Sequence, residues 1–498
     1  MEKRIRRLGI FMVLCFLALF IQLNNIQVVK AHSLATSPQN PSVIQAERSQ
    51  PRGEILAADG TVLAQSVLAP AGDYYKYQRV YPAATAGLFA NIVGWDSINY
   101  GKLGVEASYN QYLIAHNRTP KTIRDLLTNS TVTDNVTLTI QPKLQAAMAT
   151  ALNNIPQTGV SSPVSAVALD PTTGAILAMY STPTYDPNPL VSEDIKTETA
   201  AYQADIHAPG NPILAKAYAD TNAPGSTFKV VTSSAVYDHQ PALADVNYPP
   251  VGCIPLPQSN LPLCNYGHGS EVCGGTLQDS LPQSCDTAFA QLGMSLGAES
   301  LNSEAQAFGF NQVPPLDLPG VVKSNFPSVA DLANNAPSQA YSAFGQQNVT
   351  ASALQMALVA AGIANGGVIE TPHVMAQIRD SQGNLVTSYA PKPWLRSTST
   401  TTAQQVTSLM QGVVTKGTAV GVFPADENVA AKTGTAEVGT QAQYTSDWMI
   451  AFVPGSHVVV ALVAPFQASS ATGAVISGPP TCAILQAALN STEACPGA

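Results

Sequence analysis

Ser226 and Lys229 are the two residues whose types and spacing best suit covalent chemistry in this chain. Pro224 and Gly225 precede them and favour a turn, so Ser226 is expected in the first turn of a helix. Residues three apart on a helix share a face, and the Lys229 amine can then reach the Ser226 hydroxyl. A partly buried lysine has a lowered pKa and can take the hydroxyl proton, which activates the serine as a nucleophile. The pair predicts an acyl-transfer site, although a lone Ser-x-x-Lys match is usually an exposed serine beside a solvated lysine.

Two more short motifs follow Ser226 and strengthen this prediction. Residues 284–286 (Ser-Cys-Asp) begin an apolar run, and residues 432–435 (Lys-Thr-Gly-Thr) follow 428–431, which have the pattern of a buried strand. Taken singly, Ser284 could cap a helix and Lys432 could end a strand. In this order, however, the three motifs form the serine acyl-transfer signature of penicillin-binding proteins and class A β-lactamases.

The resemblance extends over about residues 45–465. Further blocks resemble class B penicillin-binding proteins, which are monofunctional D,D-transpeptidases, and among these the actinobacterial penicillin-binding protein A is most similar. The blocks lie at residues 52–64, 79–82, 104–110, 167–179, 344–347, 364–367 and 414–419.

The resemblance implies a substrate and four catalytic roles. The substrate is a peptidoglycan stem peptide that ends in D-Ala-D-Ala; Ser226 attacks its penultimate carbonyl and Lys229 takes the Ser226 proton. Ser284 passes a proton to the departing D-Ala nitrogen, aided by the charge of Lys432. An amine of a second stem peptide then attacks the acyl-enzyme, whereas a β-lactam enters the same path and leaves an acyl-enzyme that persists. No cofactor and no metal is expected.

The same resemblance assigns the substrate contacts. Lys432 and the Thr433 hydroxyl hold the terminal carboxylate of the donor peptide, and Gly434 lets a ligand approach the strand backbone. The backbone N–H groups of Ser226 and Thr435 bind the oxyanion.

Asp286 departs from the family pattern, which usually has Asn at this position. Asn both donates and accepts hydrogen bonds, whereas an ionised Asp only accepts. Asp286 can still meet the amide N–H of the substrate. Its charge, placed close to Lys229, is expected to raise the pKa of that lysine and to make it a poorer base. The neighbouring Cys285 is either a small buried residue or a reactive thiol.

Three other functions remain open from the sequence. A class A β-lactamase needs a glutamate that activates water, and the best candidate is Glu299. A D,D-carboxypeptidase would hydrolyse the same acyl-enzyme. A catalytically weak scaffold would instead bind morphogenetic partners through residues 51–155, and Asp286 favours this alternative.

The N-terminus has the pattern of a membrane anchor. Residues 1–7 carry four basic side chains and are expected in the cytoplasm. Residues 8–23 are apolar apart from Gly9 and Gln22, and with Ile26, Val28 and Val29 they approach the roughly 20 residues that cross a bilayer. Residues 8–29 therefore predict an uncleaved signal anchor with the body outside the plasma membrane. A cleaved signal peptide is the alternative, but residues 29–33 make a poor cleavage site. Because residues 51–155 are far too short to hold a glycosyltransferase domain as well, the resemblance also implies a membrane glycosyltransferase as partner.

The rest of the chain predicts an α+β fold in two regions. Residues 30–50 are a polar linker, 51–155 a small extended pedestal domain, and 156–498 a penicillin-binding transpeptidase domain of the serine β-lactamase type, with an antiparallel sheet flanked by helices. Hairpins are expected at 164–180 and 448–464, and helices near 227–238, 286–297, 350–365, 403–415 and 481–490. The Pro-rich segment 240–266 is expected to be a surface loop.

Composition excludes some partners and indicates an exported protein. The net charge is −9 and charged residues make up 11% of the chain, which argues against nucleic-acid binding. Cys15 lies in the anchor, and the six remaining cysteines are an even number that suits disulfides outside the cytoplasm. Cys253–Cys264 and Cys482–Cys495 are the expected short-range pairs. No cysteine or histidine spacing indicates a zinc site.

Overall fold

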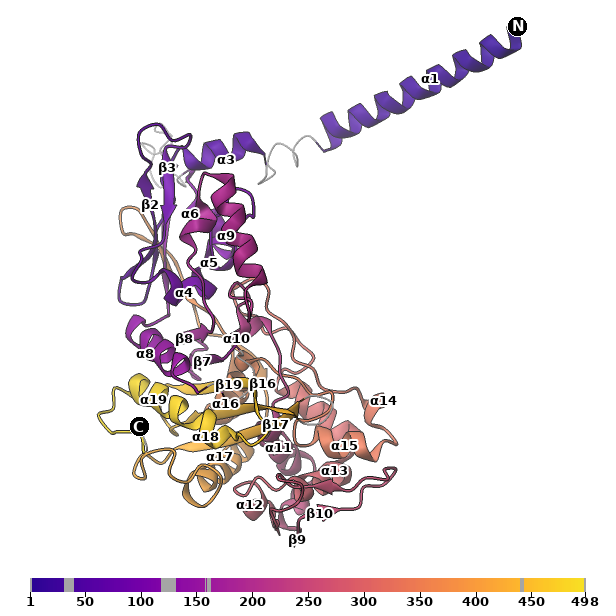
Figure 1. Ribbon diagram of the computed structural model, residues 1–498, viewed down its shortest axis with the longest axis vertical. Helices are drawn as coiled ribbons and strands as arrows, with labels where there is room; N and C mark the ends of the chain where they lie inside the picture. The colour runs from indigo at the N-terminus through magenta and orange to yellow at the C-terminus, as the bar shows by residue number, and fades with distance from the viewer. Residues whose placement is uncertain are drawn as a thin grey trace.

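The computed structural model describes residues 2–30, 40–117, 131–156, 158, 163–438 and 443–496. The chain begins with helix α1 (Glu2–Asn24), which continues into the π-helical turn η1 (Asn25–Val29). None of its residues is buried, and Figure 1 shows it projecting from the body of the protein. With a mean hydropathy of 2.0, it is the one helix of the described residues that is long and apolar enough to cross a membrane.

The expected linker at 30–50 is described only in part, since residues 31–39 lie outside the described ranges. Its second half is not an extended linker, because it forms α3 (Pro41–Arg48), capped by the Asn40 side chain. The buried guanidinium of Arg48 donates to the backbone carbonyl of Asp96, which attaches α3 to the domain below it.

A six-stranded sheet organises the upper part of the molecule in Figure 1. Its order is β15-β14-β6-β1-β2-β3, and only the β1–β6 pair is parallel. The strands are β1 (Ile55–Leu56), β2 (Val62–Leu68), β3 (Tyr77–Val80), β6 (Asp134–Leu138), β14 (Met375–Asp380) and β15 (Leu385–Ser388). Two of its strands thus come from residues 375–388, more than 200 positions beyond the other four.

A buried ion-pair network holds the strands of this sheet to the helices beside it. Glu106 is fully buried, and its two carboxylate oxygens lie 2.6 Å from the Nε atoms of Arg52 and Arg79. A buried carboxylate needs such partners, because leaving it unpaired would cost roughly 3–5 kcal/mol.

The other elements between residues 86 and 219 in this part of the chain are α4 (Ala86–Val93), α5 (Gly104–Ser108), α6 (Asn110–Leu113), β4 (His116–Asn117), β5 (Thr131–Val132), η2 (Asn188–Val191), α9 (Ile195–His207) and α10 (Lys216–Ala219).

The lower part of the molecule is built on a five-stranded antiparallel sheet. Its order is β17-β18-β19-β7-β8, so β17 is an edge strand. The bounds are β7 (Ser165–Leu169), β8 (Ile176–Ser181), β17 (Ala430–Val438), β18 (Tyr444–Phe452) and β19 (Val459–Ala468). Both hairpins predicted from the sequence are confirmed as β7–β8 and β18–β19.

Helices cover both faces of this sheet. α8 (Pro142–Asn153), α18 (Gly473–Ile476) and α19 (Gly478–Leu489) contact one face, and α16 (Ala353–Ala364) and α17 (Thr400–Lys416) contact the other. Almost every residue of α16 is buried, as expected for an apolar helix between a sheet and further helices. The architecture is therefore α+β, with an antiparallel sheet flanked by helices, as the sequence predicts.

The remaining helices lie beyond α16 and α17 and frame the cleft described below. They are η3 (Gly225–Phe228), α11 (Lys229–His239), η4 (Pro241–Asp245), α12 (Leu277–Ser280), α13 (Asp286–Ala307), α14 (Val329–Leu332) and α15 (Ala336–Ser342). The five predicted helices correspond to η3 with α11, and to α13, α16, α17 and α19. α13 continues beyond its predicted end at residue 297, with a kink at Gly297.

Segment 240–266 is not the plain surface loop expected from its prolines. It contains η4 and three short strands, and it pairs within itself and with the segment that follows. The strands of this region are β9 (Tyr248–Val251), β10 (Cys253–Ile254), β11 (Leu263–Cys264) and β12 (Cys273–Gly275); a separate pair joins β13 (Val368–Glu370) to β16 (Pro393–Arg396).

The cysteine predictions are confirmed for two pairs and wrong for Cys285. Disulfides join Cys253 to Cys264 and Cys482 to Cys495. Cys285 is buried, but it is neither a free small residue nor a thiol, because it is bonded to Cys273. Their Cα atoms lie 5.7 Å apart because the start of α13 packs against β12, which sequence spacing alone does not reveal.

Candidate active site

Ser226 lies in a tight turn that hydrogen bonds with β18 and Gly345 hold in place. The turn is the 3₁₀ segment η3, so Ser226 precedes α11 rather than lying in its first α-helical turn as expected. The indole N–H of Trp448 on β18 donates to the carbonyl of Ala223 at 2.8 Å, and Gly225 N–H donates to the Gly345 carbonyl at 3.0 Å. These bonds hold the serine at the opening of a cleft, where its hydroxyl is accessible.

The turn packs against edge strand β17, and the two backbones come closest at two glycines. Gly225 has a φ of +51°, and a Cβ added there would lie 3.0 Å from the Thr435 carbonyl oxygen. A Cβ on Gly434 would lie 2.7 Å from the Pro224 carbonyl oxygen. The two backbones can approach this closely only without side chains, so both glycines set the distance between Ser226 and the strand.

Lys229 is fully buried and makes a different contact from the one expected. Its Nζ lies 2.6 Å from Asp286 Oδ1 and donates to the Ser284 carbonyl at 2.6 Å and to Ser284 Oγ at 3.4 Å. Among the described residues, no hydrogen bond joins Nζ to the Ser226 hydroxyl. Residues three apart still stack in a 3₁₀ turn, so Lys229 lies below Ser226 while its proton donors are directed to the middle motif. Hydrogen bonds at such sites often tighten only when substrate is bound.

Ser284 lies between two lysines. Lys432 Nζ donates to its hydroxyl at 2.8 Å, and Lys229 approaches the same oxygen from the other side. Ser284 has a φ of +59°, a left-handed conformation that is uncommon outside glycine and that is typically found where a site imposes it. It is not the N-cap of α13, because that position belongs to Cys285. Ser284 therefore does not cap the helix, which is the alternative role that the sequence leaves open for it.

Burial governs the charge of both lysines. It lowers the pKa of Lys229, and the carboxylate of Asp286 opposes this change without reversing it. Burial lowers the pKa of Lys432 further below its ordinary value, and the nearby Lys229 charge adds to that effect. The expected influence of Asp286 on Lys229 is present, but desolvation is the larger cause.

Alternate residues of β17 face the cleft. Thr433, Thr435 and Glu437 line it, as a period of two requires, while Lys432 extends underneath to Ser284. The Thr433 hydroxyl shares a 2.6 Å hydrogen bond with Thr418, which fixes its position.

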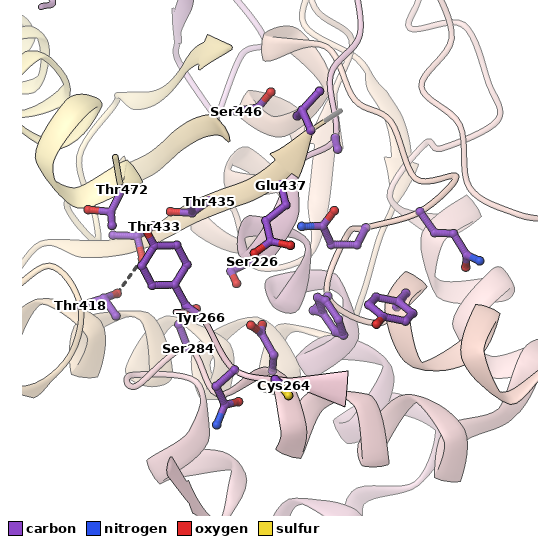
Figure 2. A pocket seen from close by; sticks show the side chains of 18 of the residues that line it. Ser226, Cys264, Tyr266, Ser284, Thr418, Thr433, Thr435, Glu437, Ser446 and Thr472 are labelled. Carbon is purple, nitrogen blue, oxygen red and sulfur yellow. Dashed lines mark hydrogen bonds between the residues drawn. The ribbon is translucent and has the colours of Figure 1, made fainter. Parts of the chain in front are cut away.

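These side chains surround one cavity of about 1020 Å³, shown in Figure 2. Ser226, Ser284, Asp286, Thr433 and Thr435 all line it, and Lys229 and Lys432 lie under its floor. Five of the predicted site residues thus line the cleft, the two lysines contact its Ser284, and Gly434 lies against the Pro224 backbone. Phe344, Gln346 and Thr418, from the family blocks at 344–347 and 414–419, also line it. Residues that the sequence analysis did not single out line it too, among them Asn265, Tyr266, Tyr341, Glu437 and Phe466.

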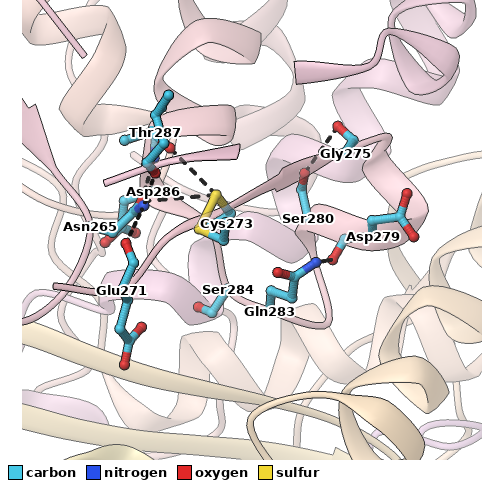
Figure 3. Close-up of a disulfide and its surroundings, with 12 residues drawn as sticks. Asn265, Glu271, Cys273, Gly275, Asp279, Ser280, Gln283, Ser284, Asp286 and Thr287 are labelled. Atoms are coloured by element: carbon cyan, nitrogen blue, oxygen red, sulfur yellow. Dashed lines mark hydrogen bonds between the residues drawn. A yellow bond between two sulfur atoms is a disulfide. The ribbon is translucent and has the colours of Figure 1, made fainter. Parts of the chain in front are cut away.

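The middle motif is supported from behind by a disulfide and a buried amide, as Figure 3 shows. The Cys273–Cys285 bond fastens the start of α13 to β12. Asn265 accepts a hydrogen bond from the Thr287 backbone N–H at 2.9 Å and donates to the Glu271 carbonyl at 3.0 Å. Ser284 and Asp286 flank Cys285, so these contacts fix both of their backbones.

Two further features concern the β-lactamase alternative and metal binding. Glu299, the candidate water-activating glutamate of a β-lactamase, is exposed on α13 and does not line the cleft. Within the described parts of the chain, no group of His, Cys, Asp or Glu side chains is arranged to hold a metal ion.

Asp447 is a buried carboxyl on β18, directly opposite Thr435 of the cleft wall. It pairs with Thr435 across β17 and β18, and its side chain is inaccessible to solvent. Thr445 donates to Oδ2 at 3.2 Å, whereas Oδ1 accepts no hydrogen bond from a described residue. Burial raises the pKa of Asp447 to about 7, against the opposing effect of the Thr445 and Thr435 hydroxyls.

Asp447→Asn is expected to make the protein less sensitive to rising pH. Folded Asp447 keeps its proton up to about pH 7, whereas the unfolded chain loses it near the ordinary value of 3.8. The resulting stabilisation is complete below pH 4 and is lost as the pH rises to 7, on the order of 3–4 kcal/mol. Melting temperatures at pH 5 and pH 8 test this: the variant should gain several degrees on wild type between the two. An equal difference at both pH values would contradict the assignment.

Comparison with known proteins gives a consistent result over almost the whole chain. Residues 164–486 match the penicillin-binding protein transpeptidase domain, and residues 52–135 match the penicillin-binding protein A dimerisation domain. The chain is 33% identical over 506 aligned residues to the peptidoglycan D,D-transpeptidase PbpA of Mycolicibacterium smegmatis, which covers 98% of this chain and 99% of that protein.

Solved structures agree with this. Penicillin-binding protein A from Mycobacterium tuberculosis, as its ceftriaxone acyl-enzyme, superposes with a TM-score of 0.78 at 30% identity, over 89% of this chain and 99% of the other. Its penicillin G acyl-enzyme gives a TM-score of 0.76 at 30% identity, over 89% and 100% of the two chains.

Proposed function

The chain belongs to the penicillin-binding protein transpeptidase family, and we propose that Ser226 is the residue that forms its acyl-enzyme. The protein is a serine peptidoglycan D,D-transpeptidase that penicillin acylates. The observation that carries the role of Ser226 is convergence: its turn, the two buried lysines and Ser284 meet at one cleft beside an edge strand.

We assign the first half-reaction as follows. Ser226 Oγ attacks the penultimate carbonyl of a donor stem peptide, and its proton passes to Lys229, whose lowered pKa makes the neutral amine accessible. The proton then moves through Ser284 Oγ, which contacts both lysines, to the nitrogen of the departing D-Ala. The bond between carbonyl carbon and D-Ala nitrogen breaks as the ester to Ser226 forms.

The oxyanion and the donor carboxylate are held by the turn and by β17. The backbone N–H groups of Ser226 and Thr435 face the carbonyl oxygen, and one such donor contributes about 10²–10³ in rate. Lys432 and the Thr433 hydroxyl, fixed by Thr418, take the carboxylate of the terminal D-Ala. Gly434 lets the peptide lie close to the strand, and Asp286 accepts a hydrogen bond from a substrate amide.

Peptide mapping tests the position of the acyl group. The full-length protein in detergent is incubated with penicillin, digested and analysed by mass spectrometry. The adduct is expected on the peptide that contains Ser226. An adduct confined to any other serine would overturn the assignment.

Asp286→Asn is expected to accelerate acylation by about tenfold, because one unit of pKa changes the neutral fraction of a base by that factor. The substitution removes the carboxylate that lies 2.6 Å from Lys229 Nζ and that holds its pKa up. The second-order rate constant for penicillin is measured at pH 7, with the exposed Asp245→Asn as a matched control. Slower acylation of Asp286→Asn would show that the carboxylate serves the reaction in another way.

We further propose the topology and the division of the chain. Residues 1–7 lie in the cytoplasm, 8–29 anchor the protein in the plasma membrane, and the body is outside; the apolar helix and its basic flank support this. Residues 51–155 supply most of the pedestal domain and 156–498 most of the transpeptidase domain; β14 and β15 complete the pedestal sheet, and α8 packs on the transpeptidase sheet. A membrane glycosyltransferase supplies the glycan strands, since neither matched domain is one that polymerises glycan.

A further inference from the structure

Glu437 continues the row of cleft-facing residues on β17 beyond those used above. It lies two residues after Thr435 and four after Thr433, on the same face of the strand, and it lines the same cavity as Ser226. In Figure 2 its carboxylate extends from the strand into the cavity on the side of Ser226. At about 3.3 Å per residue, Glu437 lies roughly 13 Å along the strand from Thr433.

The Glu437 carboxylate has no neutralising partner. Across the described residues it makes neither an ion pair nor a side-chain hydrogen bond. Its cross-strand neighbour is Thr445, whose hydroxyl is turned to Asp447. Residues 439–442, which lie outside the described ranges, are Gly-Thr-Gln-Ala and carry no charge. Glu437 is an exposed residue, and it lines the cavity that Ser226 also lines.

The other charged side chains make the two ends of the cleft differ in electrostatic potential. Lys432 and Lys229 lie buried beneath Ser284, and Asp286 is already paired with Lys229. The end near Thr433 therefore suits an anion. Glu437 and Glu271 line the same cavity, and neither carboxylate has an ion pair with a described residue; His268 is the one histidine among the described lining residues. Buried Asp447 lies opposite Thr435 on β18, and its Oδ1 has no hydrogen-bond partner among the described residues; when ionised it strengthens the negative potential there.

The reaction brings a cation to this cleft. After the donor has acylated Ser226, the second substrate is an amine, which is protonated in water near neutral pH. We propose that Glu437 is the specificity-determining residue for this acceptor: it binds the ammonium group of the second stem peptide and places its nitrogen beside the Ser226 ester. This inference rests on the proposed role of Ser226 and extends it to the second half-reaction.

The half-reaction balances without a further reactant. The acceptor nitrogen forms a bond to the acyl carbon, and the bond from that carbon to Ser226 Oγ breaks. Of the three ammonium protons, one stays on the new amide, one returns to Ser226 Oγ, and the third leaves to water. Glu437 supplies the contact that favours an amine over water, and so it favours cross-linking over hydrolysis.

The test measures how the acyl-enzyme partitions between transfer to an amine and hydrolysis by water. The full-length protein is given an acyl-D-alanyl thioester donor, whose thiolate release reports acylation, together with glycinamide or hydroxylamine as acceptor at pH 7.5. Glycinamide is largely cationic at this pH, whereas hydroxylamine is uncharged. Glu437→Gln is compared with Glu437→Asp and with Glu299→Gln, an exposed glutamate on α13 that lies away from the cleft.

For Glu437→Gln we expect the KM for glycinamide to rise about tenfold, since a hydrogen bond to a charged group in such a site contributes that much or more. The kcat and the transfer to hydroxylamine should change less than twofold. Glu437→Asp should recover part of the loss, and Glu299→Gln should match wild type.

Three results would overturn the proposal: no change in the glycinamide KM, equal losses for both acceptors, or an equal loss in Glu299→Gln. Failure of the underlying function is distinguishable, because wild-type protein would then release no thiolate. A Glu437→Gln protein that has itself lost thiolate release would place the residue in acylation and also overturn the acceptor assignment.

Discussion

Ser226→Ala is expected to abolish covalent labelling of the full-length protein by a fluorescent penicillin. Acylation needs an oxygen that becomes the ester, and alanine has none, so no slower route through the same residue remains. The serine lies on a turn held by Trp448 and Gly345, and alanine fits the same 3₁₀ geometry. The loss should therefore be chemical, with the fold retained.

Labelling is measured as the fluorescent band on a denaturing gel, against wild type and against Ser295→Ala, a serine on α13 that lies away from the cleft. An unchanged melting temperature shows that the variant is folded. Labelling of folded Ser226→Ala above about 1% of wild type would mean that another nucleophile is acylated.

Lys229→Met is expected to lower the rate of acylation by about 10²–10⁴, the usual contribution of a positioned general base. Methionine has a similar length and can occupy the space between Phe289 and Phe344, whose rings lie 5.2 and 5.7 Å from Nζ. Because the substitution removes a buried charge, it also leaves Asp286 without its partner.

The double variant Lys229→Met/Asp286→Asn separates these effects, since it has no unpaired carboxylate. Both variants should acylate slowly, whereas only the single variant should be destabilised through Asp286. The exposed Lys416→Met on α17 is the matched control. A double variant that acylates within threefold of wild type would show that another group ionises Ser226.

Sequence reasoning located the cleft because its chemistry is carried by short motifs on predictable elements. Ser226 precedes a helix, Lys432 belongs to a strand, and Ser284 stands before the long helix α13. Alternation along β17 could also have identified Glu437, since a strand that presents Thr433 and Thr435 to a ligand presents the next alternate residue too.

Other features depend on contacts that no local pattern encodes. The resting partners of Lys229 are set by where α13 begins relative to α11, and the left-handed backbone of Ser284 by the connection between α12 and α13. The Cys273–Cys285 bond requires the start of α13 to pack against β12. Asp447 resembles any strand residue until its position opposite Thr435 is known.

The sheet of the pedestal has a practical consequence for dissecting this protein. β14 pairs along nearly the whole of β6, and both it and β15 are supplied by residues 375–388. A chain truncated after residue 155 would lose those two strands and leave one edge of β6 unpaired, with β1 still on the other side, so that edge would be open to pairing with other molecules. Such a fragment should aggregate, so partner-binding studies need point variants on the intact chain.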